Sequence, residues 1–505
     1  MTNLYTSLQA CFPEDRRRPF AHMLDGTVIS YEDVEERSAA FANAIGQLGV
    51  KVGDRVAVQA EKSIDMLMLY LGCLRTGAIF LPLNTAYTAG ELDYFMRDAA
   101  PALFVCDPMN RAAIAGLASE AGVGCVETMG SDGDGSLADL ARESPNRFAT
   151  IDRDDSDLAA ILYTSGTTGR SKGAMISHAN LASNAMTLRD YWRYTADDVL
   201  LHALPIFHTH GLFVATNVVL ASGASMIFHP RFDLEAVLRS LPAATTMMGV
   251  PTFYIRLLGD PRFDRALVQH MRLFVSGSAP LSADIHREFL ERSGHAILER
   301  YGMTETNMNA SNPYDGERIA GTVGLPLPGI SIRITDPETG QVLKQGDVGM
   351  IEIAGPNVFQ GYWRMPEKTA AEFRDGYFMS GDLGLIDQQG YVSIVGRAKD
   401  LIISGGYNIY PAEVEAALDE LEQVHESAVV GVPHPDLGEG VVAAIVARDP
   451  SFTDQSAIAA ALADRIARFK QPKRFVFVQE LPKNTMGKVQ KTVLRETYHD
   501  SFKAS

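Results

Sequence analysis

Hydrophobic and polar positions along the first 80 residues follow the pattern of a helix-covered parallel sheet. The periodicity predicts a helix over residues 31–48, a strand over 55–59 and a second helix over 63–76. Alternation of helix and strand is typical of α/β folds, because each crossover helix covers one face of a parallel sheet. We therefore expect the N-terminal part of the chain to be α/β.

The same alternation returns through the middle of the chain. Short apolar runs predict buried strands, and amphipathic stretches between them predict helices. The predicted strands are residues 158–163, 199–203, 225–228 and 273–276, and the predicted helices are residues 180–191, 234–241 and 283–292.

The pattern changes after residue 390. A strand at 391–395 precedes a glycine-rich segment at 404–406, and a helix from Pro411 precedes strands near Val429 and Val442. This indicates a small α+β domain of about a hundred residues, an ordinary domain size. We expect a large α/β body with parallel-rich sheets over residues 1–396 and a C-terminal α+β domain over 397–505.

Composition narrows the class of protein. The chain has 505 residues, 46% of them hydrophobic, and a net charge of -17, which disfavours nucleic acid or an anionic membrane as a partner. Four scattered cysteines indicate a reducing compartment. The N-terminus has no apolar signal core, and no stretch of about 18 uncharged apolar residues occurs. A cytoplasmic protein without a membrane span is expected.

The most informative segment directly follows the predicted strand 158–163. Residues 163–173 read Tyr-Thr-Ser-Gly-Thr-Thr-Gly-Arg-Ser-Lys-Gly. Glycines let backbone N–H groups approach phosphate oxygens, hydroxyl groups donate further hydrogen bonds, and the lysine supplies positive charge. The spacing does not fit the P-loop template, and a flexible surface turn is the other interpretation. The position at a strand end favours a phosphate site built from Thr164, Ser165, Gly166, Thr167, Thr168, Gly169 and Lys172.

Five later segments complete a recognisable set. They are Ser-Gly-Ser-Ala-Pro at 276–280, Glu-Arg-Tyr-Gly-Met-Thr-Glu at 299–305, Ser-Gly-Asp at 380–382, Gly-Arg-Ala-Lys-Asp at 396–400 and Pro-Lys-Asn-Thr-Met-Gly-Lys at 482–488. In this order the chain resembles, over nearly its whole length, the adenylate-forming superfamily of acyl-CoA synthetases, peptide-synthetase adenylation domains and luciferases.

The resemblance implies ATP, Mg²⁺ and coenzyme A as ligands. Residues shaping the adenine pocket would be Gly277, Ser278, Ala279, Pro280, Glu299, Arg300, Tyr301 and Gly302, and Met303 would border both nucleotide and acyl group. Thr304 would touch the α-phosphate and the acyl carboxylate, and Glu305 would hold Mg²⁺. Asp382 would bind the ribose hydroxyls and Arg397 the ribose or phosphate.

The chemistry explains why such residues are needed. A carboxylate is a poor electrophile, and a mixed anhydride with AMP gives it a leaving group that a thiol can displace. Lys172 and Lys488 would neutralise the charge that builds up on phosphate. Lys488 lies far from the other motifs in sequence, so a movement of the C-terminal domain must deliver it; a surface lysine is the alternative.

In the resembling family the C-terminal domain alternates between two orientations. The hinge lies two residues after the arginine matched by Arg397, which implies Lys399. Ser404, Gly405 and Gly406 would then swing toward the adenylate and let the pantetheine arm pass close to the backbone. A simple turn between strand and helix is the alternative for these glycines.

Polar residues near the expected acyl pocket indicate a charged acid. His208 and His210 lie in one flanking segment, Arg256 ends another, and with Ser278 they could bind a second carboxylate. One such charge pair gives roughly 4 kcal/mol before desolvation, enough to discriminate against uncharged acids. The chain is similar here to malonyl-CoA synthetases, which implies malonate, with methylmalonate as a further substrate. An outward-facing Arg256 would favour acetate, propionate or a similar monoacid.

Other functions share these motifs. A domain that loads a free carrier protein and a luciferase-type oxidase are alternatives among enzymes, and a non-catalytic nucleotide-binding sensor is the alternative outside them. The joint presence of Lys172, Glu305, Asp382, Arg397 and Lys488 favours an enzyme. Because Lys488 must be charged, we also expect it to be a target for an acetyltransferase.

Overall fold

A six-stranded sheet forms the first layer of the computed structural model, which describes residues 3–164, 171–404, 407–463, 465–484 and 487–503. Its order is β6-β5-β3-β4-β7-β8, and its strands are parallel except β8, which pairs antiparallel with β7 at one edge. The strands are β3 (Arg55–Gln59), β4 (Ile79–Pro82), β5 (Leu103–Cys106), β6 (Val126–Thr128), β7 (Leu158–Thr164) and β8 (Lys172–Ser177). The accompanying helices are α2 (Tyr31–Gln47), α3 (Ile64–Thr76), α4 (Ala89–Ala99), α5 (Arg111–Glu120) and α6 (Ser136–Glu143).

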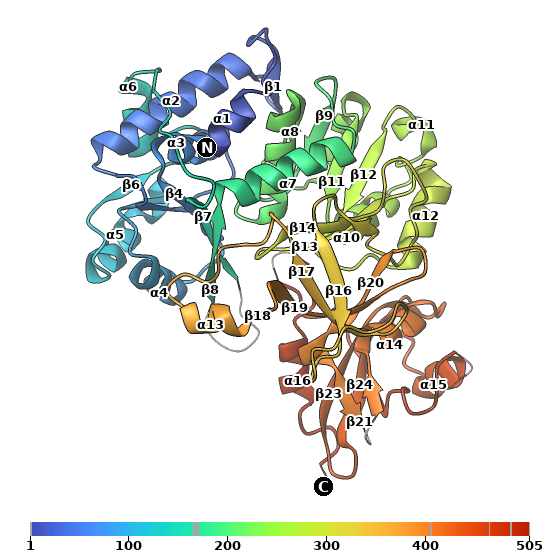
Figure 1. Cartoon of the computed structure of the whole chain (residues 1–505). Coiled ribbons are helices and arrows are strands. Elements are labelled where there is room, and N and C mark those ends of the chain that lie inside the picture. Colours follow the sequence, from blue (N-terminus) through green and yellow to red (C-terminus); the bar gives the residue numbers. More distant parts are fainter. Residues whose placement is uncertain (1–2, 165–170, 405–406, 464, 485–486, 504–505) are drawn as a thin grey trace.

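A nine-stranded sheet lies beside it, in the order β15-β14-β13-β12-β11-β9-β10-β1-β2 (Figure 1). The run from β13 to β1 is parallel, and the strands outside this run pair antiparallel. The strands are β1 (Pro19–Met23), β2 (Val28–Ser30), β9 (Val199–His202), β10 (Ser225–Phe228), β11 (Thr246–Gly249), β12 (Leu273–Ser276), β13 (Leu298–Met303), β14 (Asn307–Ser311) and β15 (Leu325–Pro326). The helices are α1 (Leu4–Gln9), α7 (His178–Tyr191), α8 (Asn217–Ser222), α9 (Leu234–Ser240), α10 (Pro251–Leu258), α11 (Arg265–Val268) and α12 (Ala283–Ser293), with a π-helix at His210–Thr216.

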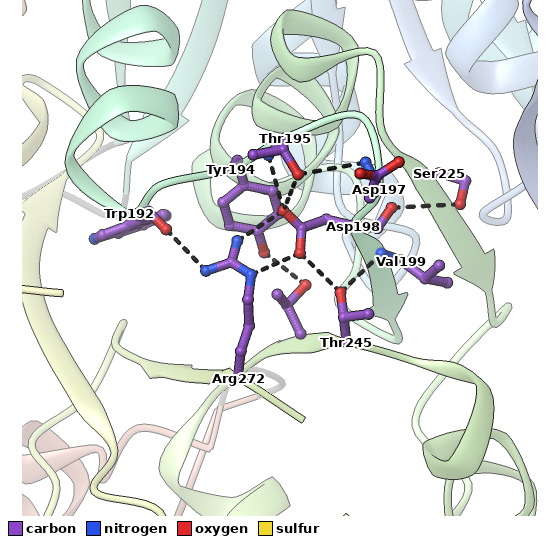
Figure 2. Close-up of polar contacts among 10 residues, drawn as sticks. Trp192, Tyr194, Thr195, Asp197, Asp198, Val199, Ser225, Thr245 and Arg272 are labelled. Atoms are coloured by element: carbon purple, nitrogen blue, oxygen red, sulfur yellow. Dashed lines mark hydrogen bonds and ion pairs between the residues drawn. The ribbon is translucent and has the colours of Figure 1, made fainter. Parts of the chain in front are cut away.

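A buried ion pair joins the amino ends of three neighbouring strands in this sheet (Figure 2). Arg272, just before β12, donates from Nε and Nη2 to the two carboxylate oxygens of Asp198, at 2.6 and 2.8 Å. Asp198 precedes β9 and also accepts from the Thr245 hydroxyl, which precedes β11, at 2.9 Å. The pair therefore fixes how β9, β11 and β12 enter the sheet, and so where their carboxyl ends emerge.

Residues 331–397 form an antiparallel sheet in place of a continued helix-covered parallel pattern. It runs β16-β17-β19-β18, with β20 on the other part of β19. The strands are β16 (Ser331–Thr335), β17 (Gly349–Ala354), β18 (Phe373–Arg374), β19 (Tyr377–Ile386) and β20 (Val392–Arg397), and α13 (Pro366–Ala371) lies between β17 and β18 in the chain. Only two residues separate β18 from β19 and five separate β19 from β20, and connections this short join antiparallel strands.

The C-terminal part has a sheet of its own, at one end of the molecule in Figure 1. Its order is β22-β21-β24-β23, with β25 parallel to β24. The elements are β21 (Ile402–Ser404), β22 (Tyr407–Ile409), α14 (Pro411–Asp419), β23 (Val424–His434), β24 (Gly438–Ala447), α15 (Gln455–Ala463), β25 (Arg474–Phe477) and α16 (Lys491–Tyr498). The predicted large body with parallel-rich sheets and a small C-terminal domain is confirmed.

Most predicted elements occur with small changes at their ends. The strands expected at 55–59, 225–228 and 273–276 are β3, β10 and β12 without change. The helix expected at 180–191 begins two residues earlier, because the Ser177 side chain caps it by accepting from the Asn180 N–H. Among the described residues, no helix has the length and apolar character needed to cross a bilayer.

Candidate active site

The β7–β8 hairpin carries the two described ends of the predicted phosphate loop. Thr164 closes β7, Lys172 opens β8, and the two are register partners. The remaining predicted loop residues, Ser165, Gly166, Thr167, Thr168 and Gly169, lie outside the described residues. A distant segment covers the outer edge of β8. Met175 donates to the carbonyl of residue 361 and accepts from the N–H of residue 360, and the Gly173 carbonyl accepts from the N–H of residue 363, all at 2.8–2.9 Å.

Lys172 and Glu305 lie on either side of Tyr362, a residue that no sequence pattern singled out. The Lys172 amine lies 4.1 Å from the centre of the Tyr362 ring and 3.6 Å from a carboxylate oxygen of Glu372. The Tyr362 hydroxyl donates to Glu305 at 3.1 Å. Only the fold reveals this contact, since Tyr362 is 190 residues from Lys172 and belongs to no phosphate-binding pattern.

Glu305 has the surroundings expected of a ligand for a hard cation. It lies in the turn between β13 and β14, is 7% exposed, and burial raises the pKa of its carboxyl, with the Tyr362 hydrogen bond and Lys172 opposing that rise. No Lys or Arg nitrogen of the described chain lies within ion-pair distance of it. Mg²⁺ typically takes one or two carboxylates together with substrate phosphates, so one buried, unneutralised carboxylate fits this ion. The described residues hold no larger cluster of metal-ligating side chains.

Asp382 receives donors from two elements. The Tyr301 hydroxyl donates to one oxygen at 2.5 Å, and Arg397 Nε lies 2.6 Å from the other. Asp382 and Arg397 are register partners on β19 and β20, which explains their contact. Asp382 holds the pKa of Arg397 above its ordinary value. A buried carboxylate between an arginine and a tyrosine can accept further hydrogen bonds, as from ribose hydroxyls.

Lys488 comes from the C-terminal part and lies at the same site. Its loop is closed by Asn484, whose carboxamide oxygen accepts from the Lys488 N–H at 3.0 Å. The loop rests on α10, since a Cβ at Gly487 would lie 3.2 Å from Thr252. The side chain keeps solvent access. Partial removal of the amine from water by the surrounding protein lowers its pKa, the charge of Arg397 lowers it further, and Asp382 opposes the decrease. In this arrangement Lys488 therefore lies close enough to Arg397 and Asp382 to interact with their charges.

Polar groups gather at the carboxyl ends of β9 and β12. Ser278, held at φ 72°, lies 3.2 Å from His210 through Oγ and Nδ1. Burial lowers the pKa of His210 well below its ordinary value, and Arg300 lowers it further. Burial also lowers the pKa of His208, to about 4, and Lys488 contributes. Both histidines are therefore neutral at physiological pH.

Arg300 is a buried cation without an acidic partner in the described chain. It is 4% exposed, and its Nε and Nη2 make no hydrogen bond to any described residue. Burial lowers its pKa to about 9. A Cβ at residue 277 would lie 2.4 Å from its Cζ, so Gly277 leaves the space that the guanidinium occupies. An unpaired buried guanidinium is a ready partner for an anion.

Other predicted residues lie elsewhere. Arg256, on α10, is exposed, and its guanidinium lies 5.8 Å from the centre of the Phe232 ring; no contact joins it to His210 or Ser278. Lys399 lies in the short helix Ala398–Asp400, and Ser404 ends β21. Gly405 and Gly406 lie outside the described residues. Ala279, Pro280, Glu299, Gly302, Met303 and Thr304 follow or lie on β12 and β13, near Ser278 and Glu305 in the chain.

This fold and site define an enzyme that activates carboxylates with ATP. Residues 11–363 match the AMP-binding enzyme family, and residues 413–488 match the AMP-binding enzyme C-terminal domain. The chain belongs to the AMP-binding enzyme family and is an AMP-forming acyl-CoA synthetase.

Similar proteins agree on the reaction class. The chain is 36% identical to a feruloyl-CoA synthase from an Amycolatopsis species over 94% of both chains. It is 33% identical to a malonate–CoA ligase from Arabidopsis thaliana over 88% of this chain and 78% of that protein. Crystal structures of MatB from Rhodopseudomonas palustris cover 99% of both chains, with a TM-score of 0.97 and 58% identity for the ATP-bound form and 0.86 and 57% for the apo form. The predicted resemblance is confirmed, and the arrangement here is nearer the ATP-bound form.

Proposed function

We propose that the enzyme is a malonyl-CoA synthetase, which joins malonate, and also methylmalonate, to coenzyme A with release of AMP and pyrophosphate. The observation that carries the proposal is the unpaired guanidinium of Arg300 near the His210–Ser278 pair. The single carboxylate of a monoacid reacts at the α-phosphate, so a monoacid would leave the buried Arg300 without an anionic partner. A dicarboxylate has a second carboxylate that Arg300 can bind. The similarity to a malonate–CoA ligase supports the same substrate.

In the first half-reaction one carboxylate oxygen of malonate attacks the α-phosphorus, and pyrophosphate leaves with the bonding electron pair. Thr304 would orient the attacking carboxylate, while Lys172 and Lys488 offset the charge that develops on phosphate oxygens. Asp382 and Arg397 would hold the ribose, and residues 277–280, 299 and 301–303 the adenine. Mg²⁺ held by Glu305 would neutralise the triphosphate and orient pyrophosphate as it leaves.

In the second half-reaction the coenzyme A sulfur attacks the acyl carbon, and AMP leaves with the electron pair. We propose that residues 397–505 turn as a unit about Lys399, which removes Lys488 and brings residues 404–406 to the adenylate. In this structure Asp400, next to Lys399, is paired with Arg495 on α16 at 2.5 Å. Through that ion pair, α16 and the Lys488 loop would rotate together with the segment that follows Lys399.

Two further proposals concern the protein in its setting. A cytoplasmic location follows from the scattered, unpaired cysteines. Acetylation of Lys488 by a protein acetyltransferase would remove its charge, and its solvent access supports this proposal. Full adenylation activity in a protein acetylated at Lys488 would contradict it.

A small-monoacid CoA ligase is the second candidate, because Arg256 is exposed. The test is AMP release with ATP, Mg²⁺ and coenzyme A, comparing malonate, methylmalonate, acetate, butyrate and benzoate. It uses wild type, Arg300→Met, Arg256→Ala and the exposed control Arg147→Ala. We expect a malonate preference that only Arg300→Met abolishes.

Each other outcome has a defined meaning. Loss of the preference in Arg256→Ala alone would move the second carboxylate to that residue. A wild-type preference for a monoacid would overturn the dicarboxylate proposal and keep the ligase class. No AMP with any acid would favour a nucleotide-binding sensor.

A further inference from the structure

Lys62 is a buried lysine that the mechanism above does not use. It lies between β3 and α3 and is 8% exposed. Its amine donates to the His202 carbonyl at 2.9 Å, lies 3.0 Å from His202 Nδ1, and stands 4.3 Å from the centre of the Phe228 ring. No carboxylate of the described chain lies within ion-pair distance. Burying a lysine without a counter-charge costs free energy. The placement of Lys62 against His202 therefore calls for a functional explanation.

His202 links Lys62 to the π-helix His210–Thr216. It ends β9, is 1% exposed, and its Nε2 lies 3.0 Å from the Gly211 carbonyl oxygen and 3.3 Å from the Thr216 hydroxyl. A carbonyl oxygen only accepts, so Nε2 carries the ring proton. In a neutral imidazole Nδ1 is then the acceptor, and Lys62 is the donor to it. The lysine thus selects the tautomer that binds Gly211.

The backbone that ends at Gly211 is closely packed. A Cβ there would lie 2.0 Å from the Pro205 carbonyl oxygen, so residues 205–211 fold back on themselves. His210, the preceding residue, contacts Ser278 with Nδ1, and its Nε2 is buried without a partner among described residues. π-helical turns are frequent at functional sites. The Gly211 carbonyl is therefore one residue from a group that faces the acyl pocket.

We propose that Lys62 is a positioning residue for the acyl pocket: through His202 and the Gly211 carbonyl it holds residues 208–210 in the orientation that binds the carboxylic acid. The inference rests on the proposed role of His210 in acid binding. Lys62 touches no substrate itself. It joins the six-stranded sheet to the pocket wall of the nine-stranded sheet.

The experiment compares steady-state kinetics of Lys62→Met with wild type and with Lys51→Met, an exposed lysine. Methionine keeps the unbranched apolar stem and removes the donor. We expect the KM for the acid to rise about tenfold, roughly the effect of one lost hydrogen bond. The KM for ATP should stay within about twofold, and the melting temperature should not fall. An unchanged KM for the acid, or equal increases for acid and ATP, would overturn the proposal.

Coupling to His210 separates positioning from general stability. In a His210→Ala background, Lys62→Met should have little further effect on the KM for the acid, because the group being positioned is gone. Independent, multiplicative effects would contradict the proposal. If Lys62→Met does not fold, His202→Gln and His202→Leu replace it. Glutamine can offer an N–H near the position of Nε2 and should keep the KM near wild type, whereas leucine should raise it; equal behaviour would contradict the proposal.

All measurements use the acid that wild type turns over best. A monoacid preference in wild type would therefore count against the malonate proposal alone. A Lys62→Met enzyme that keeps its KM for that acid would count against the positioning role alone.

Discussion

The guanidinium of Arg300 occupies the space beside Gly277 that a side chain would fill, with Cζ 2.4 Å from the position of a Cβ. The φ angle of Gly277 is not positive, so conformational freedom is not the reason for a glycine at this position. The reason is room for a buried cation. This relationship links a residue after β12 to a residue on β13, and it makes a prediction.

Gly277→Ala should displace the Arg300 guanidinium and raise the KM for the preferred acid more than tenfold. The methyl group and Cζ cannot both be accommodated at 2.4 Å, and the arginine is the more mobile partner. Steady-state kinetics with acid and ATP varied separately would measure this. Gly259→Ala on the surface is the control, since a Cβ there meets only backbone oxygens at 3.4 and 3.6 Å. An unchanged KM in Gly277→Ala would remove Arg300 from the acyl pocket.

Lys488→Gln should reduce adenylation by about 10²-fold or more, the usual loss when one preorganised charge on the transition state is removed. Formation of thioester from a supplied acyl-adenylate should change less than threefold, because that step does not use Lys488. Pyrophosphate exchange and coenzyme A acylation measure the two steps. Lys483→Gln is the matched control, since that lysine is on the same loop and pairs with Glu426 at 2.5 Å. Equal losses in both steps would argue against separate arrangements.

Glu299→Gln should remove a pH dependence from folding stability. Burial raises the pKa of Glu299 from 4.5 to about 8. Between these values the folded state binds more protons than the unfolded state, so wild-type stability falls as pH rises from about 4.5 to 8. The glutamine variant should lack this contribution and gain on wild type over that window. Denaturant unfolding at several pH values measures it, and a constant difference would contradict the raised pKa.

Asp198→Ala should lower the free energy of unfolding by ~3 kcal/mol, because it leaves the charge of Arg272 largely buried and unpaired. The Asp198 side chain is 4% exposed and that of Arg272 22%. The adjacent Asp197 side chain is 94% exposed, so Asp197→Ala is the control, with an expected change within ~0.5 kcal/mol. Denaturant unfolding measures both. Similar losses in the two variants would mean that the ion pair in Figure 2 contributes little.

Local hydrophobic patterns predicted most helices and strands. Features that depend on contacts between distant parts of the chain were not predicted. Strands such as β3 and β10 were predictable because an apolar run of this length between helices has few other structures. The antiparallel sheet of residues 331–397 was not predicted, since its short strands alternate only partly and lack crossover helices. The resemblance placed Arg300 with the adenine residues, whereas our proposal assigns it to the acyl pocket because of its burial beside Gly277 and near His210.

The site shows the same division. Resemblance located Lys488, Asp382 and Arg397, which the structure brings together, but gave no sign of Tyr362 or Lys62. Both make their contacts with residues at least 57 positions away, Tyr362 with Glu305 and Lys62 with His202. Arg256 was selected for its charge, for its segment beside the expected acyl pocket and for the resemblance, but one arginine on an amphipathic helix does not reveal which way it faces.

The sealing of β8 by residues 360–363 has a consequence for biosynthesis. β8 is an edge strand, and its outer backbone groups stay open until a segment almost two hundred residues later has been made. At ordinary rates of translation that interval lasts on the order of ten seconds or more. Throughout it the nascent chain presents an unpaired strand edge, which is a template for association with other chains. Protection of this edge by chaperones while the ribosome is still at work would therefore limit such association.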